Sequence, residues 1–126
     1  MDARFEQAKT FFLEGLAHYR AGRYESAERD FSASLALVPG RPSTLTNLGA
    51  TRLKLGRVEE ATALLQEALR QEPDNAEALG HLAAALAEAG QHESALAAVT
   101  RAVNLSPANG AAWSLRGTLA RGLGRR

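Results

Sequence analysis

Histidine side chains are the residues of this sequence best suited to hold a metal ion or to move a proton near neutral pH. The sequence has three of them, His18, His81 and His92. They fall at unrelated intervals and form no HxxxH pair, the spacing that would place two imidazoles on one face of a helix as metal ligands. We therefore interpret all three as helix-surface residues and predict no metal site.

The sequence also contains no pattern that indicates a catalytic nucleophile or a phosphate-binding loop. The sequence contains no cysteine, which excludes a thiolate nucleophile, a thiolate metal site and a disulfide framework. Its glycines do not form a phosphate-cradling loop after a strand. Glu59, Glu60 and Glu88 fall on predicted helices, where solvated carboxylates are a simpler interpretation than acid–base catalysis. We predict that the chain is not an enzyme and binds no cofactor.

The overall composition narrows the class of protein further. A chain of 126 residues with 45% hydrophobic residues has the size and apolar content of one globular domain. Fifteen basic against fourteen acidic residues give a net charge of +1, which argues against nucleic-acid binding. No segment resembles a signal peptide or a membrane span. We expect a cytoplasmic protein, and because only Lys9 and Lys54 are lysines we expect a GC-rich bacterial source.

The elements that must position any functional side chain follow from an internal repeat. Prolines recur at intervals of 34 residues, and glycines keep the same interval in a different phase. Small and large apolar residues also recur with this period. Residues at the same position of successive units form a column, and the columns are Pro39, Pro73 and Pro107; Gly22, Gly56, Gly90 and Gly124; Gly15, Gly49, Ala83 and Gly117; Phe11, Leu45, Leu79 and Trp113; and Ala27, Ala61 and Ala95. A shared period of this length predicts a stacked array of similar units.

Each unit is predicted to contain two antiparallel helices. Apolar residues recur at intervals of three and four over residues 45–55 and 79–89, which is a helical pattern that stops at Gly56 and Gly90. Glycine there can adopt the positive φ that closes a helix.

The second helix of each unit is expected over residues 58–71 and 92–105, because a proline follows each segment and cannot continue it. Asn75 and Asn109 are expected to cap the next first helices. The small-residue columns would let the axes of neighbouring helices approach closely.

The sequence resembles the tetratricopeptide repeat family, whose pattern is a large apolar residue, then Leu-Gly, an aromatic residue, and later Ala, Phe, Ala and Pro. The second unit matches through Leu45, Leu48, Gly49, Ala61, Leu65, Ala68 and Pro73, and the third through Leu79, Leu82, Ala83, Leu86, Ala95, Val99, Ala102 and Pro107. The first unit matches through Phe11, Gly15, Tyr24, Ala27, Phe31 and Pro39. It departs at Glu14, where leucine is usual, and at Ser34, where alanine is usual.

The resemblance implies an all-α fold, a right-handed superhelical array of antiparallel helix pairs (an α-solenoid) with about seven helices. The whole chain, residues 1–126, would be one domain. Its repeats would span residues 8–41, 42–75 and 76–109, followed by a partial repeat or capping helix over residues 110–126.

The resemblance also implies a function, a protein-interaction scaffold that binds a peptide or protein segment in a concave groove lined by the first helices. The groove candidates are Lys9, Phe12, Leu16, Tyr19, Thr46, Asn47, Ala50, Gly80, His81 and Ala84. Leu13, Arg20, Ser43, Lys54, Glu77 and Glu88 would continue this surface. An apolar anchor of the ligand is expected near Phe12 and Leu16.

Chaperone-binding relatives hold a C-terminal carboxylate with lysines, asparagines and an arginine on successive first helices. In this sequence only Asn47 fits that pattern. Phe12 and Leu16 replace the first lysine and asparagine, and Glu77 and His81 replace the later lysine and arginine. The resemblance therefore predicts no tight binding of a chaperone tail.

The fourth unit contains a predicted helix over residues 111–123 and no second helix, with Gly122 and Gly124 typical of a turn. This pattern favours the amino-terminal part of a longer bacterial protein. One alternative is a regulatory or substrate-presenting domain of a transferase whose catalytic domain lies outside this chain. Another is a scaffold that self-associates through residues 110–126, if Trp113, Leu119 and Leu123 are exposed.

Overall fold

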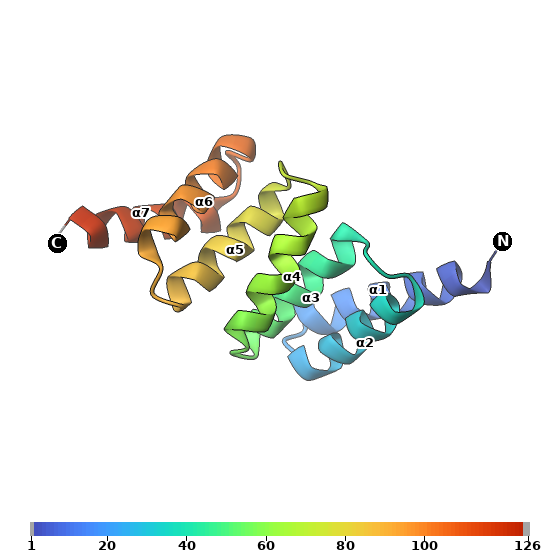
Figure 1. Cartoon of the computed structure of the whole chain (residues 1–126). Coiled ribbons are helices and arrows are strands. Elements are labelled where there is room, and N and C mark those ends of the chain that lie inside the picture. The colour runs from blue at the N-terminus through green and yellow to red at the C-terminus, as the bar shows by residue number, and fades with distance from the viewer. Residues whose placement is uncertain (1, 125–126) are drawn as a thin grey trace.

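The computed structural model describes residues 2–124. These residues form seven α-helices and no strand (Figure 1). The helices are α1 Ala3–Arg20, α2 Tyr24–Leu37, α3 Pro42–Lys54, α4 Val58–Gln71, α5 Ala76–Glu88, α6 His92–Leu105 and α7 Gly110–Gly124. The predicted all-α solenoid is confirmed, and α4 and α6 span the residues expected for the second helices.

The first helices end where the periodic glycines stand. Gly22, Gly56 and Gly90 have φ values of 78°, 81° and 82°, a conformation that glycine adopts without strain. At the end of α3 the amide of Arg57 donates to the Arg52 carbonyl at 2.8 Å and the amide of Gly56 donates to the Leu53 carbonyl at 3.0 Å. This Schellman arrangement satisfies carbonyls that the helix end leaves free, as the sequence predicted.

The two expected asparagine caps are present. Asn75 Oδ1 accepts a hydrogen bond from the Ala78 amide at 3.0 Å, and Asn109 Oδ1 accepts one from the Ala112 amide at 3.1 Å. Each cap satisfies an amide that the first turn of the helix cannot pair internally. The caps therefore define where α5 and α7 begin.

Small residues bring the two helices of a pair together. A Cβ atom on Gly15 would lie 2.7 Å from Phe31 Cε1, and one on Gly49 would lie 2.8 Å from Leu65 Cγ. Both distances are too short for carbon atoms, so each glycine is needed for the packing of a large side chain from the partner helix. The predicted role of this column is confirmed at these two positions.

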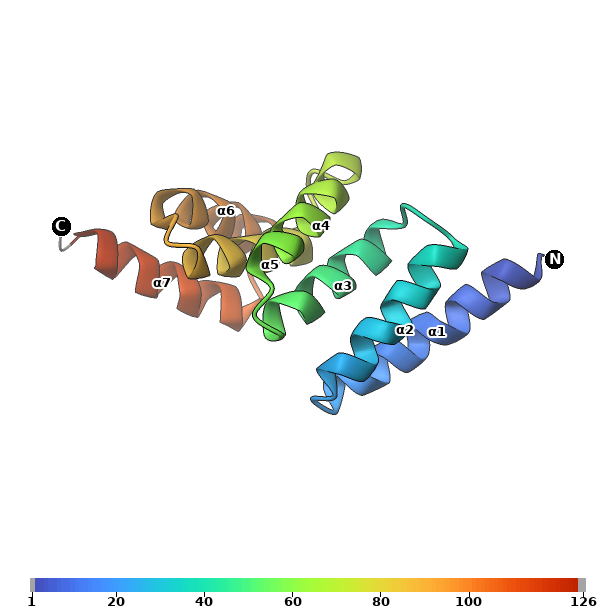
Figure 2. The ribbon, with the colours of Figure 1, turned by 60° about the horizontal axis from the view of Figure 1, so that its bottom comes forward.

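The order of the helices in space follows from their contacts. Each helix packs against its neighbours in sequence, and α3 also contacts α1 and α5, while α5 also contacts α7. Within residues 2–124 the even-numbered helices have no such contacts with one another. The odd-numbered helices therefore form the tighter, inner side of the array, and the stacked pairs are visible in Figures 1 and 2.

Two expectations about individual residues need correction. Leu119 is only 6% exposed because it packs into the cluster of α5, α6 and α7 around Val99, so it does not belong to an exposed apolar side. His18 is not simply a surface residue, since its Nδ1 lies 2.6 Å from Asp30 Oδ2 and joins α1 to α2. Trp113 does remain 45% exposed, with its Nε1 donating to the Pro107 carbonyl at 2.8 Å.

Helix α7 also extends further than expected. It continues through Gly122 to Gly124, where the sequence indicated a turn. None of the helices in residues 2–124 has the length and apolar character needed to cross a bilayer.

A cleft between the first helices

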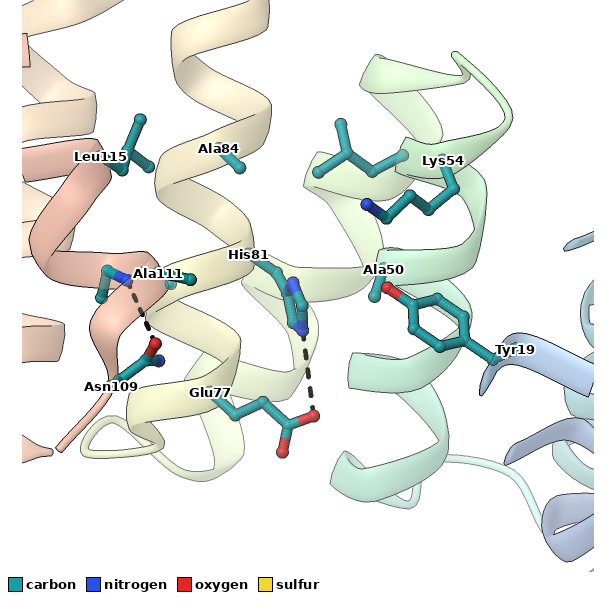
Figure 3. A pocket seen from close by; sticks show the side chains of 12 residues that line it. Tyr19, Ala50, Lys54, Glu77, His81, Ala84, Asn109, Ala111 and Leu115 are labelled. Carbon is teal, nitrogen blue, oxygen red and sulfur yellow. Dashed lines mark hydrogen bonds and ion pairs between the residues drawn. The ribbon is translucent and has the colours of Figure 1, made fainter. Parts of the chain in front are cut away.

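A cleft of about 370 Å³ opens on the side of the array that α1, α3, α5 and α7 share (Figure 3). Tyr19 reaches it from α1, and Ala50, Leu53 and Lys54 reach it from α3. The opposite wall comes from α5 and α7. The residues of that wall are Glu77, Gly80, His81, Ala84, Asn109, Ala111, Ala112 and Leu115.

The floor of the cleft is made of very small residues. Ala50, Gly80, Ala84 and Ala111 place little more than backbone at the bottom. A Cβ on Gly80 would have only one atom nearby, Asn109 Nδ2 at 4.0 Å. Unlike Gly15 and the other packing glycines, Gly80 therefore leaves open space instead of making room for a neighbouring side chain.

Two polar groups enter the cleft from the α1 and α3 side. Figure 3 shows the Tyr19 hydroxyl and the Lys54 ammonium group both directed into the opening. The Tyr19 ring packs on Tyr24 with centroids 5.4 Å apart in an edge-on arrangement, which holds the ring in place. Burial, reinforced by Tyr24 and by the negative charge of Glu77, raises the pKa of Tyr19 above 10.0, so its hydroxyl stays protonated at neutral pH and can donate or accept a hydrogen bond.

A carboxylate and an imidazole line the α5 side. His81 Nε2 lies 3.9 Å from Glu77 Oε1, one helical turn away. The imidazole of His81 lowers the pKa of Glu77 below 4.5, although partial burial acts in the opposite direction. Glu77 is therefore negatively charged at neutral pH, and it faces the cleft together with Asn109, whose Nδ2 lies beside Gly80.

A second, more polar groove of about 340 Å³ shares Glu77 with the cleft. It lies between the amino-terminal ends of α3 and α5, and Arg41, Asn47 and Glu72 contribute to it. Asn47 Nδ2 donates to the Ser43 carbonyl of its own helix at 2.8 Å, which leaves its Oδ1 as the atom that can accept from a ligand.

Thr46 also lines this groove and has an unusual environment. Only 2% of the residue is exposed, and its buried Oγ1 has no hydrogen-bond partner among the residues that the structure describes. A buried hydroxyl without a partner costs free energy.

The structure brings together half of the predicted groove residues. Tyr19, Ala50, Gly80, His81 and Ala84 meet in the cleft, and Lys54 and Glu77 lie beside them. Thr46 and Asn47 are found in the adjoining groove.

The other predicted residues of α1 do not line the cleft. Phe12 and Leu16 pack against the buried cluster around Phe31, with the Phe12 and Phe31 ring centroids 5.7 Å apart. Lys9 is exposed and lines neither opening. The apolar anchor expected at Phe12 and Leu16 therefore contributes to the core of the first helix pair.

Sequence reasoning missed the residues that α7 contributes to the wall. Asn109, Ala111 and Leu115 were assigned only to a cap or a capping helix, yet they line the cleft. The period of 34 residues contained the signal, because Leu115 occupies the repeat position of Asn47 and His81. A strict comparison of columns would have included it.

Comparison with known proteins supports the repeat architecture. A family model described as tetratricopeptide repeat matches residues 52–119, and a second model with the same description matches residues 8–41. No curated protein matches the sequence.

Solved structures show the same fold at low sequence identity. The first TPR of Spaghetti (RPAP3) bound to the HSP90 peptide SRMEEVD is 19% identical with a TM-score of 0.87, and the match covers 95% of both chains. The Arabidopsis OM64 TPR domain is 19% identical with a TM-score of 0.88, covering 94% of this chain and 98% of that one. The Sgt2 TPR domain from Aspergillus fumigatus is 20% identical with a TM-score of 0.85, covering 92% and 78%.

Proposed function

Because the chain belongs to the tetratricopeptide repeat family, we propose that it is a protein-interaction scaffold that binds a peptide or protein segment in the cleft between α1, α3, α5 and α7. The observation that carries this proposal is the cleft itself. Four helices from four successive units converge on one opening that combines a small-residue floor with polar groups at its rim.

The dimensions of the cleft favour a segment of chain over a folded domain. A volume of about 370 Å³ lies near the lower end of the range for ligand pockets, about 300–1,000 Å³. The alanine and glycine floor lets the backbone of that segment come close to α5, and the rim offers both donors and acceptors to its peptide groups.

The structure of the first TPR of Spaghetti (RPAP3) with an HSP90 peptide supports peptide binding as the mode, without identifying the ligand of this chain. The positions that would form a carboxylate clamp here hold Phe12, Leu16, Glu77 and His81, and Phe12 and Leu16 are partly buried in the core. We expect calorimetry with an acidic C-terminal peptide to give no micromolar binding. Tight binding that disappears in Asn47→Ala would contradict this expectation.

The proposal is tested by selecting peptides from a random display library on the immobilised protein. Gly80→Trp fills the cleft, since a side chain at that position points into open space. Ala97→Trp is the matched control, because Ala97 is exposed on α6 and lines neither the cleft nor the adjoining groove. We expect peptides selected on the wild type to bind Ala97→Trp and not Gly80→Trp. Equal binding to both variants, or no selected peptide, would refute the proposed site.

Self-association through residues 110–126 is a second candidate, favoured by the exposed Trp113. Sedimentation at several concentrations tests it, and a monomer at all concentrations would exclude it. The regulatory or substrate-presenting role beside a transferase, the cytoplasmic location and the origin in a longer bacterial protein stay predictions, which the full gene would test.

A further inference from the structure

The two ends of the cleft differ in charge. In Figure 3 α3 and α5 run in the same direction. Lys54 is the last residue of α3, and Glu77 lies in the first turn of α5. The ammonium group and the carboxylate therefore enter the cleft at opposite ends, with Ala50 and His81 between them (Figure 3).

Neither charge is neutralised by a strong internal partner. Lys54 is exposed and forms no ion pair among residues 2–124. Among the residues that the structure describes, Glu77 has one ion-pair partner, His81 at 3.9 Å, and 63% of the Glu77 side chain is exposed. Both groups are thus available to a ligand that carries complementary charges.

The surroundings strengthen the difference between the two ends. The adjoining groove adds Glu72 on the Glu77 side, and the two carboxylates there outnumber the single guanidinium of Arg41. Asn47 Oδ1 is a further acceptor on that side. The Tyr19 hydroxyl, which also points into the cleft, can donate or accept a hydrogen bond and therefore favours neither charge.

We propose, resting on the function proposed above, that the cleft selects a dipolar segment of chain. This segment carries a carboxylate that pairs with Lys54, a lysine or arginine that pairs with Glu77, and a small apolar side chain between them on the floor formed by Ala50, Gly80 and Ala84. Charge complementarity of this kind determines the direction in which a segment lies more than its total affinity.

The magnitude of each charge contact is modest because both groups are exposed at the rim. Ion pairs between exposed groups typically contribute about 0.2–1 kcal/mol, which corresponds to about a 1.5- to 5-fold change in Kd. Reversing both charges replaces two attractive contacts with two repulsive ones. The Kd of a ligand bound in the original direction is therefore expected to weaken by at least about fourfold.

The test uses the paired charge reversal Lys54→Glu/Glu77→Lys, which leaves the net charge unchanged. Peptides are selected from a random display library on the wild type and on this variant, and their Kd values are measured by calorimetry. On the wild type we expect sequences with an acidic and a basic residue in a constant order around a small apolar residue. On the paired variant we expect the opposite order, with Kd values for wild-type peptides weakened at least about fourfold.

Two controls keep the outcome interpretable. Arg23→Glu/Glu25→Arg reverses two exposed charges outside the cleft and should select the same peptides as the wild type. Charge reversal at helix ends can destabilise α3 and α5, so circular dichroism must show that the variant is folded. The neutral pair Lys54→Gln/Glu77→Gln is a milder variant. It should lose the preference for one order of charges in the peptide.

Three results are distinguishable. Reversal of the selected order supports the dipolar segment. Peptides that bind in the cleft with no preference for charge order, or with an order that the paired variant does not change, overturn it and leave the proposed function intact. Failure of the folded wild type to select any peptide overturns both.

Discussion

A single methyl group added at Gly80 should stabilise the protein, and the same group added at Gly49 should destabilise it. Gly49 lies inside α3 and Gly80 lies inside α5, so each is in the first helix of its unit. Neither has a positive φ, so alanine fits the backbone at both positions. The contrast depends only on what the new Cβ atom meets.

The expected magnitudes follow from these surroundings. Alanine is favoured over glycine inside a helix by about 0.5–1 kcal/mol, and this gain is unopposed at Gly80, where the nearest atom to a Cβ lies 4.0 Å away. At Gly49 the Cβ would lie 2.8 Å from Leu65 Cγ and 3.4 Å from the Ala61 carbonyl oxygen. Overpacking of a core typically costs about 1–3 kcal/mol, which exceeds the helix gain.

Urea unfolding followed by circular dichroism measures both effects. With a slope of about 2 kcal/mol/M, Gly80→Ala should raise the midpoint by about 0.25–0.5 M, and Gly49→Ala should lower it. The methyl group that Gly80→Ala adds should also weaken the binding of peptides that occupy the floor of the cleft. Midpoints that shift in the same direction in the two variants would refute the reasoning from local packing.

Three further substitutions test other parts of the structure. Ser34→Ala restores the residue usual in the family, yet it should lose about 1 kcal/mol because the buried Ser34 Oγ donates to the Ala8 carbonyl at 2.8 Å; an unchanged urea midpoint would contradict this. Thr46→Val removes a buried hydroxyl without a partner and should be neutral or stabilising by about 1 kcal/mol, whereas a clear loss of stability by calorimetry would show that the hydroxyl has a partner. Burial raises the pKa of Tyr19 above 10.0, so its stabilising contribution is complete below that pH and is lost as the pH rises through the higher folded value. Tyr19→Phe should therefore lose less stability than the wild type as the pH rises above about 10, and parallel stability profiles would disprove the assignment.

The helices of this protein could be predicted from the sequence because their ends depend on local interactions. Glycine at positive φ, proline after a helix and asparagine at an N-cap act within a few residues, so Gly56, Pro73 and Asn75 each predicted a boundary that the structure confirms. Helix α7 was the exception at its carboxyl end. Gly122 and Gly124 have the composition of a turn, but the helix continues through both.

The candidate site could be predicted only in part, because exposure depends on partners that are distant in sequence. Phe12 and Leu16 occupy first-helix positions that suggest a ligand contact, but Phe31 from α2 packs against them. The sequence pattern predicts an exposed Leu119, but packing against the cluster around Val99 buries it. Ser34 departs from the family pattern for a reason that only appears when α1 lies beside it.

By itself, the sequence determined a repeat of 34 residues, the pairing of helices within each repeat and the residues at their ends, since these are local properties of the chain. Only the tertiary structure decided where a ligand could lie. The cleft exists because α7 closes it with Ala111 and Leu115 opposite Tyr19 and Lys54, and its opposed charges depend on α3 and α5 running in the same direction. The packing of four helices determines how far apart these side chains lie, and a local pattern of residues does not specify that packing.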